Sequence, residues 1–328
     1  MLKKIKKYIR RLLERFRLYY ESYRDANRYF SSASWAGPTD QHRAAHIEAD
    51  LIKHYHVIEK GLAMPDFRPE FGKPVVRRLE ELIVVWEDQI GDGDNCQYMA
   101  AQETMRAYFE KHDLIGIDVS DVVPSKYREN KISGSQIAAG VKPAHFTYSK
   151  EECHSFNEFI KSRHSVRSFR MDCIPSAVEI RSAISVATST PSVCNRQTWR
   201  VHVYEGDKAQ VVLNQQNGNR GFGHQVPLAL VITTDMRCFA EVIERYQPWI
   251  EGGLFSMNLM LALHARGIAN VALNWSRKTA ADISLRRVAD IPNYERIIMV
   301  LACGYAEDDA LTPESCRHEV ARFVRWHD

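Results

Sequence analysis

The sequence lacks the features that mark several classes of protein. Its seven cysteines are odd in number, scattered, and never spaced as C-x-x-C, which argues against a disulfide framework and against a thiolate metal site. No apolar run approaches the roughly 18 residues that span a bilayer. The formal net charge is only +3, so no overall field favours nucleic acid. We therefore expect a cytoplasmic protein with no bound metal and no nucleic-acid partner.

The 328 residues favour two domains, and positive charge is concentrated at the start of the chain. Residues 1–30 place apolar side chains alternately three and four positions apart, which predicts a long basic amphipathic helix with a heptad seam. Three interpretations of this helix stay open: packing within a dimer, docking to another protein, or peripheral binding to an anionic membrane. The narrow seam and its aromatic residues favour contact with another helix, whereas the flanking basic residues keep membrane association open.

Residues 31–147 are predicted to form a helical region followed by a linker. Gly61 is interpreted as the glycine that ends the first helix of this region. The helical pattern weakens between 114 and 147, where we place a linker or an extended wrapping segment. The N-terminal half is therefore expected to be all-helical. Helices are predicted near residues 41–60, 75–90 and 95–113.

Histidines in the first of these helices allow a metal site to be drawn. His46, Asp50 and His54 fall four positions apart and therefore share one face of the helix. Stacked histidines on a helix more often satisfy ordinary hydrogen bonds within the core or at the surface. We therefore expect no metal at this position.

The second half of the chain, residues 148–328, has strand-like runs alternating with helical ones. Ser149 and Glu152 form a capping-box signal for one helix, and Pro175 opens a second. This alternation predicts an α/β or α+β domain in which helices cover a sheet. Strands are predicted at residues 200–205, 227–234, 268–275 and 296–304, and further helices at about 250–266, 279–289 and 314–326.

Two polar segments of this half have the chemistry of a ligand site. Residues 162–169 (SRHSVRSF) hold an Arg–Ser pair of the kind that binds a phosphate dianion through charge-assisted hydrogen bonds. Residues 190–199 (TPSVCNRQTW) hold amide side chains that can hydrogen-bond the edge of a heteroaromatic ring. Taken alone, each segment is more often structural, a basic turn in water or a polar loop before a strand. Spacing by itself leaves both alternatives open.

In this order and at this separation, the two segments resemble the nitroreductase-like FMN family, which shows R-[RH]-S-[IV]-R-x-F and then P-S-x-x-N-x-Q-P-W. This chain has R-H-S-V-R-S-F and P-S-V-C-N-R-Q-T-W. The similarity continues in GGLFSMNLMLALHARGIANVALNWS and LACGYA. It implies an α+β fold, with a nitroreductase-like FMN domain at 148–328 whose central mixed sheet is flanked by helices. The basic helix 1–30 and the helical region 31–147 would precede this domain.

The resemblance also implies a role for each matching residue of the first segment. Arg163 and Ser165 would bind the FMN phosphate, with His164 beside them and Arg317 as a second cation. Arg167 would lie near the N1–C2 carbonyl edge of the isoalloxazine. Negative charge collects there on reduction, so a fixed cation favours the reduced flavin.

A second set of residues would approach the flavin ring, partly from another subunit. Pro191, Ser192 and Asn195 would come from the partner subunit because family members place the flavin at a dimer interface. Gln197 would also reach the ring. Because the cofactor carries the chemistry, no catalytic side chain is named. The backbone groups expected beside N5 are those of Asn274, Trp275 and Ser276.

The function implied by the resemblance is an FMN-dependent oxidoreductase at a homodimer interface. It would take electrons from NAD(P)H and pass them, by ping-pong hydride transfer, to an unidentified small molecule that is conjugated or electron-poor. No G-x-G-x-x-G follows a strand-like run, so a separate Rossmann domain is not expected. The alternative is a non-catalytic dimeric scaffold or interaction protein of a biosynthetic complex, since the helical N-terminal region resembles that of extended members linked to polysaccharide biosynthesis. Thr198 and Ala306 stand where the family has prolines, beside the expected substrate entrance.

Overall fold

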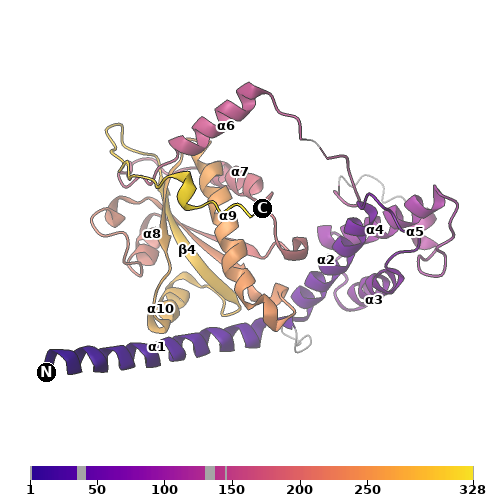
Figure 1. Cartoon of the computed structure of the whole chain (residues 1–328), viewed down its shortest axis with the longest axis horizontal. Helices are drawn as coiled ribbons and strands as arrows, with labels where there is room; N and C mark the ends of the chain where they lie inside the picture. The colour runs from indigo at the N-terminus through magenta and orange to yellow at the C-terminus, as the bar shows by residue number, and fades with distance from the viewer. Residues whose placement is uncertain (1, 35–41, 130–136, 145, 328) are drawn as a thin grey trace.

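The computed structural model describes residues 2–34, 42–129, 137–144 and 146–327. Figure 1 shows a long helix α1, a group of helices α2 to α5, and a sheet flanked by α7, α8, α9 and α10, with α6 projecting beyond it. Within the described ranges, no helix is both long enough and apolar enough to cross a membrane. The α-helices are α1 (Leu2–Ser32), α2 (Arg43–Leu62), α3 (Lys73–Gln89), α4 (Cys96–Asp113), α5 (Lys126–Glu129), α6 (Lys150–Ser162), α7 (Ala177–Ala187), α8 (Gly206–Leu213), α9 (Gln247–His264) and α10 (Thr279–Ala289).

The strands β1 (Trp199–Glu205), β2 (Leu228–Asp235), β3 (Ala269–Asn274) and β4 (Glu295–Gly304) form one sheet in the order β1-β2-β4-β3. The predicted α+β fold with helices around a sheet is confirmed. The expected mixed sheet is wrong for these strands, because every neighbouring pair runs antiparallel. The strands β2 and β3, joined through α9, do run in the same direction, but β4 inserts between them and pairs with both. In the described part of the chain, parallel pairing occurs at one isolated bridge, between Ser165 and Asn270.

Both faces of the sheet are covered, and alternate residues of β2 enter different hydrophobic clusters. Leu230 packs on the side of α7 and α9, where Trp199 stacks on Phe255 with 4.9 Å between ring centroids. Its neighbour Val231 packs on the side of α8 and α10. All residues of β2 are buried, which explains why this strand is a continuous apolar run in the sequence.

The helices α2, α3 and α4 pack around a hydrophobic cluster of their own, which confirms an all-helical region before the sheet. The segment after α4 continues this core, since Val119, Val123 and Tyr127 are buried in it. The first part of the predicted linker therefore wraps the helical core, as one of the two expectations had it. The domain boundaries near 30 and 147 stay a prediction.

Two local predictions are confirmed, and one helix is wrong. The capping box predicted at the start of α6 is present, with Ser149 paired to Glu152, and α7 begins just after Pro175 as expected. A second capping box, between Ser176 and Glu179, was not predicted. The helix predicted at 314–326 is a single 3₁₀ turn, η7 (Val320–Arg322), in an exposed segment. Since a short helix needs an apolar face packed on something, the pattern alone does not hold this one together.

Gly61 has a different role from the one expected. The helix α2 continues through it to Leu62 instead of ending before it. A Cβ at this position would lie 1.9 Å from Cε2 of the Phe71 ring. The glycine therefore lets an aromatic side chain pack directly on the helix backbone, and its value lies in packing and not in helix termination.

Candidate functional site

The first candidate segment lies along the outer edge of the sheet, beside β3. At the end of α6, Arg163 has extended backbone angles that turn the chain alongside the strand. Ser165 then bridges to Asn270 in a parallel sense. The buried side chain of Phe169, 1% exposed, fixes the end of the segment in the core. The segment is thus held at both ends, with its polar side chains between them.

A cluster of basic groups lies where this segment meets the C-terminal end of α9. Ser162 Oγ and His264 Nε2 are 2.8 Å apart. Burial lowers the pKa of His264, and the positive charges of Arg163 and His164 lower it further. Within the described ranges, Arg163 forms no ion pair with a carboxylate. The chemistry of this donor set therefore fits an anion such as a phosphate.

Two further arginines of the predicted site are exposed. Arg167 donates from Nη1 to Ser165 O at 3.2 Å. Arg317 lies in the exposed C-terminal segment, and nothing in the described part of the chain bonds it to Arg163. A single chain thus brings Arg163, His164, Ser165 and Arg167 to one sheet edge. The role of Arg317 stays a prediction.

The end of β3 lies along the same edge. Asn274 is four residues beyond the Asn270 bridge, about 13 Å along a strand. Trp275 is buried, and its Nε1 donates to Asp282 Oδ1 at 3.2 Å, so only its backbone is left for a ligand. Asn274 and Ser276 are exposed, and Ser276 N donates to Asn274 Oδ1 at 3.1 Å. A ligand that touches both places has to be elongated, with its anion at the Arg163 end.

The second candidate segment is a loop with unusual backbone angles just before β1. Cys194, Asn195 and Gln197 have φ values of 51°, 56° and 49°, in the left-handed region. Such conformations cost non-glycine residues about 1–3 kcal/mol each and persist only where the surroundings hold them. Ser192 Oγ accepts from Gln197 N at 3.0 Å, and Gln197 Nε2 donates to Asn195 O at 3.2 Å. Pro191 is exposed at the start of the loop.

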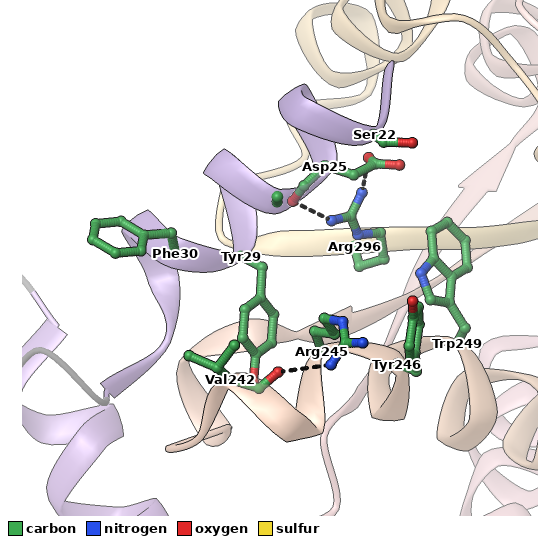
Figure 2. Close-up of a pocket in the computed structure, with 10 residues that line it drawn as sticks. Ser22, Asp25, Tyr29, Phe30, Val242, Arg245, Tyr246, Trp249 and Arg296 are labelled. Carbon is green, nitrogen blue, oxygen red and sulfur yellow. Dashed lines mark hydrogen bonds and ion pairs between the residues drawn. The ribbon is translucent and has the colours of Figure 1, made fainter. Parts of the chain in front are cut away.

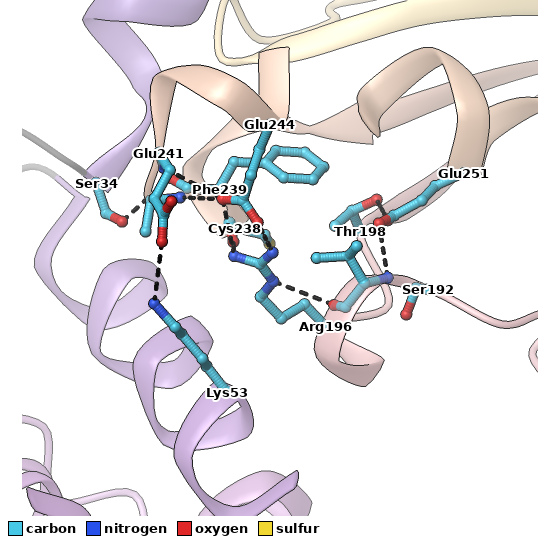
Figure 3. Close-up of polar contacts among 12 residues, drawn as sticks. Ser34, Lys53, Ser192, Arg196, Thr198, Cys238, Phe239, Glu241, Glu244 and Glu251 are labelled. Carbon is cyan, nitrogen blue, oxygen red and sulfur yellow. Dashed lines mark hydrogen bonds and ion pairs between the residues drawn. The ribbon is translucent and has the colours of Figure 1, made fainter. Parts of the chain in front are cut away.

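A buried arginine ties this loop to the turns before α9 (Figure 3). Arg196 is 3% exposed and donates to Val193 O at 3.2 Å and to Cys238 O at 2.9 Å. Its guanidinium also pairs with Glu244 in η6 (Val242–Tyr246). Burial is the largest single influence on the pKa of Glu244 and would raise it. The hydrogen bond and charge of Arg196, together with hydrogen bonds from the backbone of Ala240 and Glu241, outweigh burial and hold the pKa below its usual value. The pair is therefore charged in the folded chain.

A buried carboxylate of α9 holds the loop from the other side. Glu251 is 2% exposed and accepts from Val193 N at 2.8 Å and from Thr198 Oγ at 2.6 Å (Figure 3). Burial raises the pKa of Glu251, and these two hydrogen bonds oppose the rise. The strained residues thus lie between two anchored points, which fixes where Ser192 and Asn195 are presented.

The helical region also reaches this loop. Tyr55 of α2 is 3% exposed, and its hydroxyl donates to Gln97 Oε1 at 2.5 Å. Burial raises the pKa of Tyr55, and the nearby Asn195 side chain opposes the rise. The helical half of the chain therefore reaches the loop near Asn195.

The two candidate segments lie at opposite edges of the sheet. The loop precedes β1, whereas Arg163 and Ser165 lie on the outer side of β3, so four strand spacings of about 19 Å in total separate them. Each segment is a formed half of a site, and one chain does not bring them into contact. The role assigned to each residue stays a prediction.

The histidines of α2 make ordinary hydrogen bonds. His46 is buried with Nε2 3.2 Å from Ser32 O, and His54 Nδ1 lies 2.7 Å from Asp50 O. Burial lowers the pKa of His46. Across the residues that the structure describes, no group of three or more His, Cys, Asp or Glu side chains is placed to hold a metal.

Sequence reasoning missed the residues that support the site. Arg196 and Glu251 anchor the loop, Tyr55 lies near Asn195, and His264 borders the basic cluster. Glu251 did leave a signal, because it is an acidic residue within the otherwise apolar WIEGGLF run. A charge in such a run is buried only if it is paired or hydrogen-bonded, so it predicts a structural contact.

Comparison with known proteins assigns the second half of the chain. Residues 160–215 and 205–305 match the model of the nitroreductase family. Over these residues the chain is similar to the nitroreductase family. A curated relative, the iodotyrosine dehalogenase 1 homolog of Caenorhabditis elegans, is 22% identical over 201 residues, and the match covers 52% of this chain and 61% of that protein.

Solved structures with nitroreductase names are also similar to this chain. A nitroreductase-like protein of Streptococcus mutans is 21% identical with a TM-score of 0.46, covering 54% of this chain and 100% of that one. An FMN-dependent nitroreductase of Clostridium difficile is 20% identical with a TM-score of 0.44, covering 52% and 98%.

Nitroreductase-family proteins are oxidoreductases and generally depend on FMN. The match confirms the resemblance seen in the two sequence motifs, both of which fall inside it. The nitroreductase domain thus contains the basic edge, the strained loop and the sheet between them. The link to polysaccharide biosynthesis stays a prediction.

Proposed function

We propose that this chain is an FMN-dependent enzyme that uses NAD(P)H to reduce a small molecule. The observation that carries the proposal is the basic edge beside β3. Arg163, His164 and Arg167 lie within five residues there, and no carboxylate pairs with either arginine in the described part of the chain. Exposed or half-buried cations held in this way are a site for an anionic ligand.

In this proposal the chain's own residues bind and orient the cofactor. Arg163 and Ser165 hold the phosphate, and His164 lies beside them. Arg167 faces the N1–C2 edge, where its fixed charge favours reduction. The backbone of residues 274–276 aligns the ring about 13 Å further along the edge. When bound, FMN supplies the centre that accepts and donates hydride.

The proposal includes a homodimer, in which the loop of one chain completes the site of the other. The helix α9 supports it, because Ile250, Leu254 and Met257 form an exposed apolar stripe at four- and three-residue spacing. The separation of the two half-sites across the sheet also supports it. Pro191, Ser192, Asn195 and Gln197 would then act on the flavin of the partner chain, and a monomer in solution would contradict this part.

The proposed reaction is ping-pong: NAD(P)H binds, gives up a hydride and leaves before the acceptor occupies the same face. We propose an acceptor that is conjugated or electron-poor, since such molecules take up hydride readily. The curated relative is named a dehalogenase, so iodotyrosine belongs in the first set of acceptors to be tried.

The first test is the absorbance spectrum of the purified protein. We expect a yellow protein that releases FMN on denaturation and whose flavin absorbance bleaches when NADH or NADPH is added without oxygen. A colourless protein that also fails to bind added FMN would refute the proposal and favour the scaffold alternative. Flavin that neither nicotinamide bleaches would refute the choice of reductant.

The second test is Arg163→Ala, with Arg181→Ala on the exposed surface of α7 as the matched control. Loss of a charge-assisted contact to phosphate costs about 1.5–3 kcal/mol, so FMN should bind roughly ten- to a hundredfold more weakly. The control should bind FMN as the unchanged protein does. Equal affinity in both variants would show that the phosphate lies elsewhere.

A further inference from the structure

The helix α1 is attached to the nitroreductase domain by one polar stripe (Figure 2). Asp25 pairs with Arg296 at the start of β4. Tyr29 is buried and donates to Glu241 O at 2.6 Å. Two more residues of the same stripe make further contacts: Arg28 lies 2.7 Å from Asp282, and Glu21 accepts from Thr279 N at 3.0 Å.

Most of the large exposed apolar side chains of α1 lie on the opposite side of the helix. At about 100° per residue, their centre is roughly 180° from the stripe that includes Asp25. They are therefore turned away from the domain, and each is between 38% and 67% exposed. The apolar face of α1, as we define it, consists of Ile5, Tyr8, Ile9, Leu12, Leu13, Phe16, Tyr19, Tyr20 and Tyr23.

Basic residues occupy the rest of the same stretch of helix. Residues 3–17 contain eight lysines and arginines, and Glu14 is their one acidic residue. Glu14 is itself paired with Arg17 at 2.7 Å on the surface. The apolar face is thus bordered by strong positive charge, which requires a negatively charged occupant.

A second copy of this helix fits that charge poorly. In the heptad of the apolar seam, the flanking positions hold Lys6 and Arg15 and otherwise Tyr8, Leu13, Tyr20 and Ser22, with no acidic residue. Two paired copies would therefore gain no ion pair across the seam and would bring like charges together. The apolar face also spans roughly 140°, wider than a coiled-coil seam, as is typical of a helix lying on a flat surface.

We propose that α1 binds an anionic lipid surface, with its apolar face in the headgroup and acyl boundary. Five aromatic side chains of this face, four of them tyrosines, suit that boundary because each has an apolar ring, and the tyrosines also a polar end. The lysines and arginines then meet the lipid phosphates. Since the domain is attached on the opposite side of the helix, it stays in water when the helix is bound (Figure 1). This inference does not depend on the proposed flavin chemistry.

The test is co-sedimentation of the full-length protein with two kinds of vesicle: phosphatidylglycerol mixed with phosphatidylcholine, and phosphatidylcholine alone. We expect binding to the first kind, weakened by salt, and little to the second. The double variant Leu12→Gln with Phe16→Gln keeps good helix formers and should bind at least about tenfold more weakly. The matched control is Leu18→Gln. Leu18 is also apolar and is 65% exposed, but it lies on the basic side of the helix, so this variant should bind like the unchanged protein.

Other outcomes decide against the proposal. No binding of the unchanged protein to anionic vesicles overturns it, as does equal loss in the Leu18 control. The unchanged protein could instead fail to bind vesicles and form a larger particle in light scattering. If the double variant is smaller in the same measurement, the apolar face serves a protein contact. Lys6→Gln with Arg15→Gln, which flank the apolar face, should weaken binding by about fivefold per charge, and no change there overturns the role of the phosphates. Circular dichroism of each variant checks that the chain is folded.

Discussion

The anchoring of the strained loop by Glu251 leads to a quantitative prediction for Glu251→Ala. The substitution removes the acceptor of two hydrogen bonds, at 2.8 Å from Val193 N and 2.6 Å from Thr198 Oγ. Thr198 is 0% exposed, so its hydroxyl has no water to turn to. An unsatisfied buried donor costs about 1–3 kcal/mol. Two donors lose their acceptor, but removal of the buried carboxylate offsets part of that cost. We therefore expect the free energy of unfolding to fall by about 2–4 kcal/mol.

Glu251→Gln is the matched control. The amide oxygen still accepts from Val193 N–H, and the Thr198 hydroxyl can accept from the new NH₂ group. We expect a loss of about 1 kcal/mol or less for this variant. In thermal unfolding followed by circular dichroism, the alanine variant should melt roughly 5–10 °C below the glutamine variant. Equal melting temperatures would refute the view that Glu251 holds the loop.

The same pair of variants tests the function of the loop. If Ser192 and Asn195 contact the flavin of a partner chain, release of the loop in Glu251→Ala should weaken FMN binding while the glutamine variant retains it. The measurement is flavin fluorescence at a temperature where both variants are folded. A destabilised alanine variant with unchanged FMN affinity would separate the loop from the flavin.

Two further predictions concern α9 and its end. Gly252→Ala places a Cβ 2.4 Å from Cγ1 of Ile298 and should lower the free energy of unfolding by about 1–3 kcal/mol. At Gly253 an added Cβ would meet nothing within 4 Å, so Gly253→Ala should be tolerated. Equal midpoints of urea unfolding for the two variants would contradict this prediction. Burial and the charges of Arg163 and His164 lower the pKa of His264 in the folded chain. The neutral His264 ring is therefore compatible with the fold above about pH 6.5, and the folded chain loses stability as the pH falls from there towards the lowered pKa of His264. Stability of the FMN-free protein should therefore decrease between pH 7.5 and 5.5 by more than in His264→Gln, and parallel pH profiles would rule this out.

Local chemistry was predicted well because it depends on neighbouring residues. The capping box of α6 bonds residues three positions apart, Pro175 marks the start of α7, and the strands were visible as apolar runs. The helix at 314–326 failed because nothing packs on it. Gly61 was singled out but misinterpreted, because glycine is required there by the close packing of the Phe71 ring and not by the end of a helix.

The candidate site divides in the same way. The motif segments around Arg163 and Asn195 were found from the sequence, because residue type and spacing carry their chemistry. Their supports were not found: Glu251 lies 58 positions from Val193, and Tyr55 lies 140 positions from Asn195. No local pattern encodes contacts at such separations.

The sequence by itself thus determined the four strands and most of the helices, where two helices begin, and which residues have the chemistry to bind an anion. Tertiary structure decided that β4 lies between β2 and β3, that the two polar segments lie at opposite sheet edges, and that α1 turns its apolar face away from the domain. The first set follows from hydrogen bonds and periodicity within a few residues. The second follows from packing between segments up to 271 positions apart, such as Asp25 on Arg296, which only the folded chain brings together.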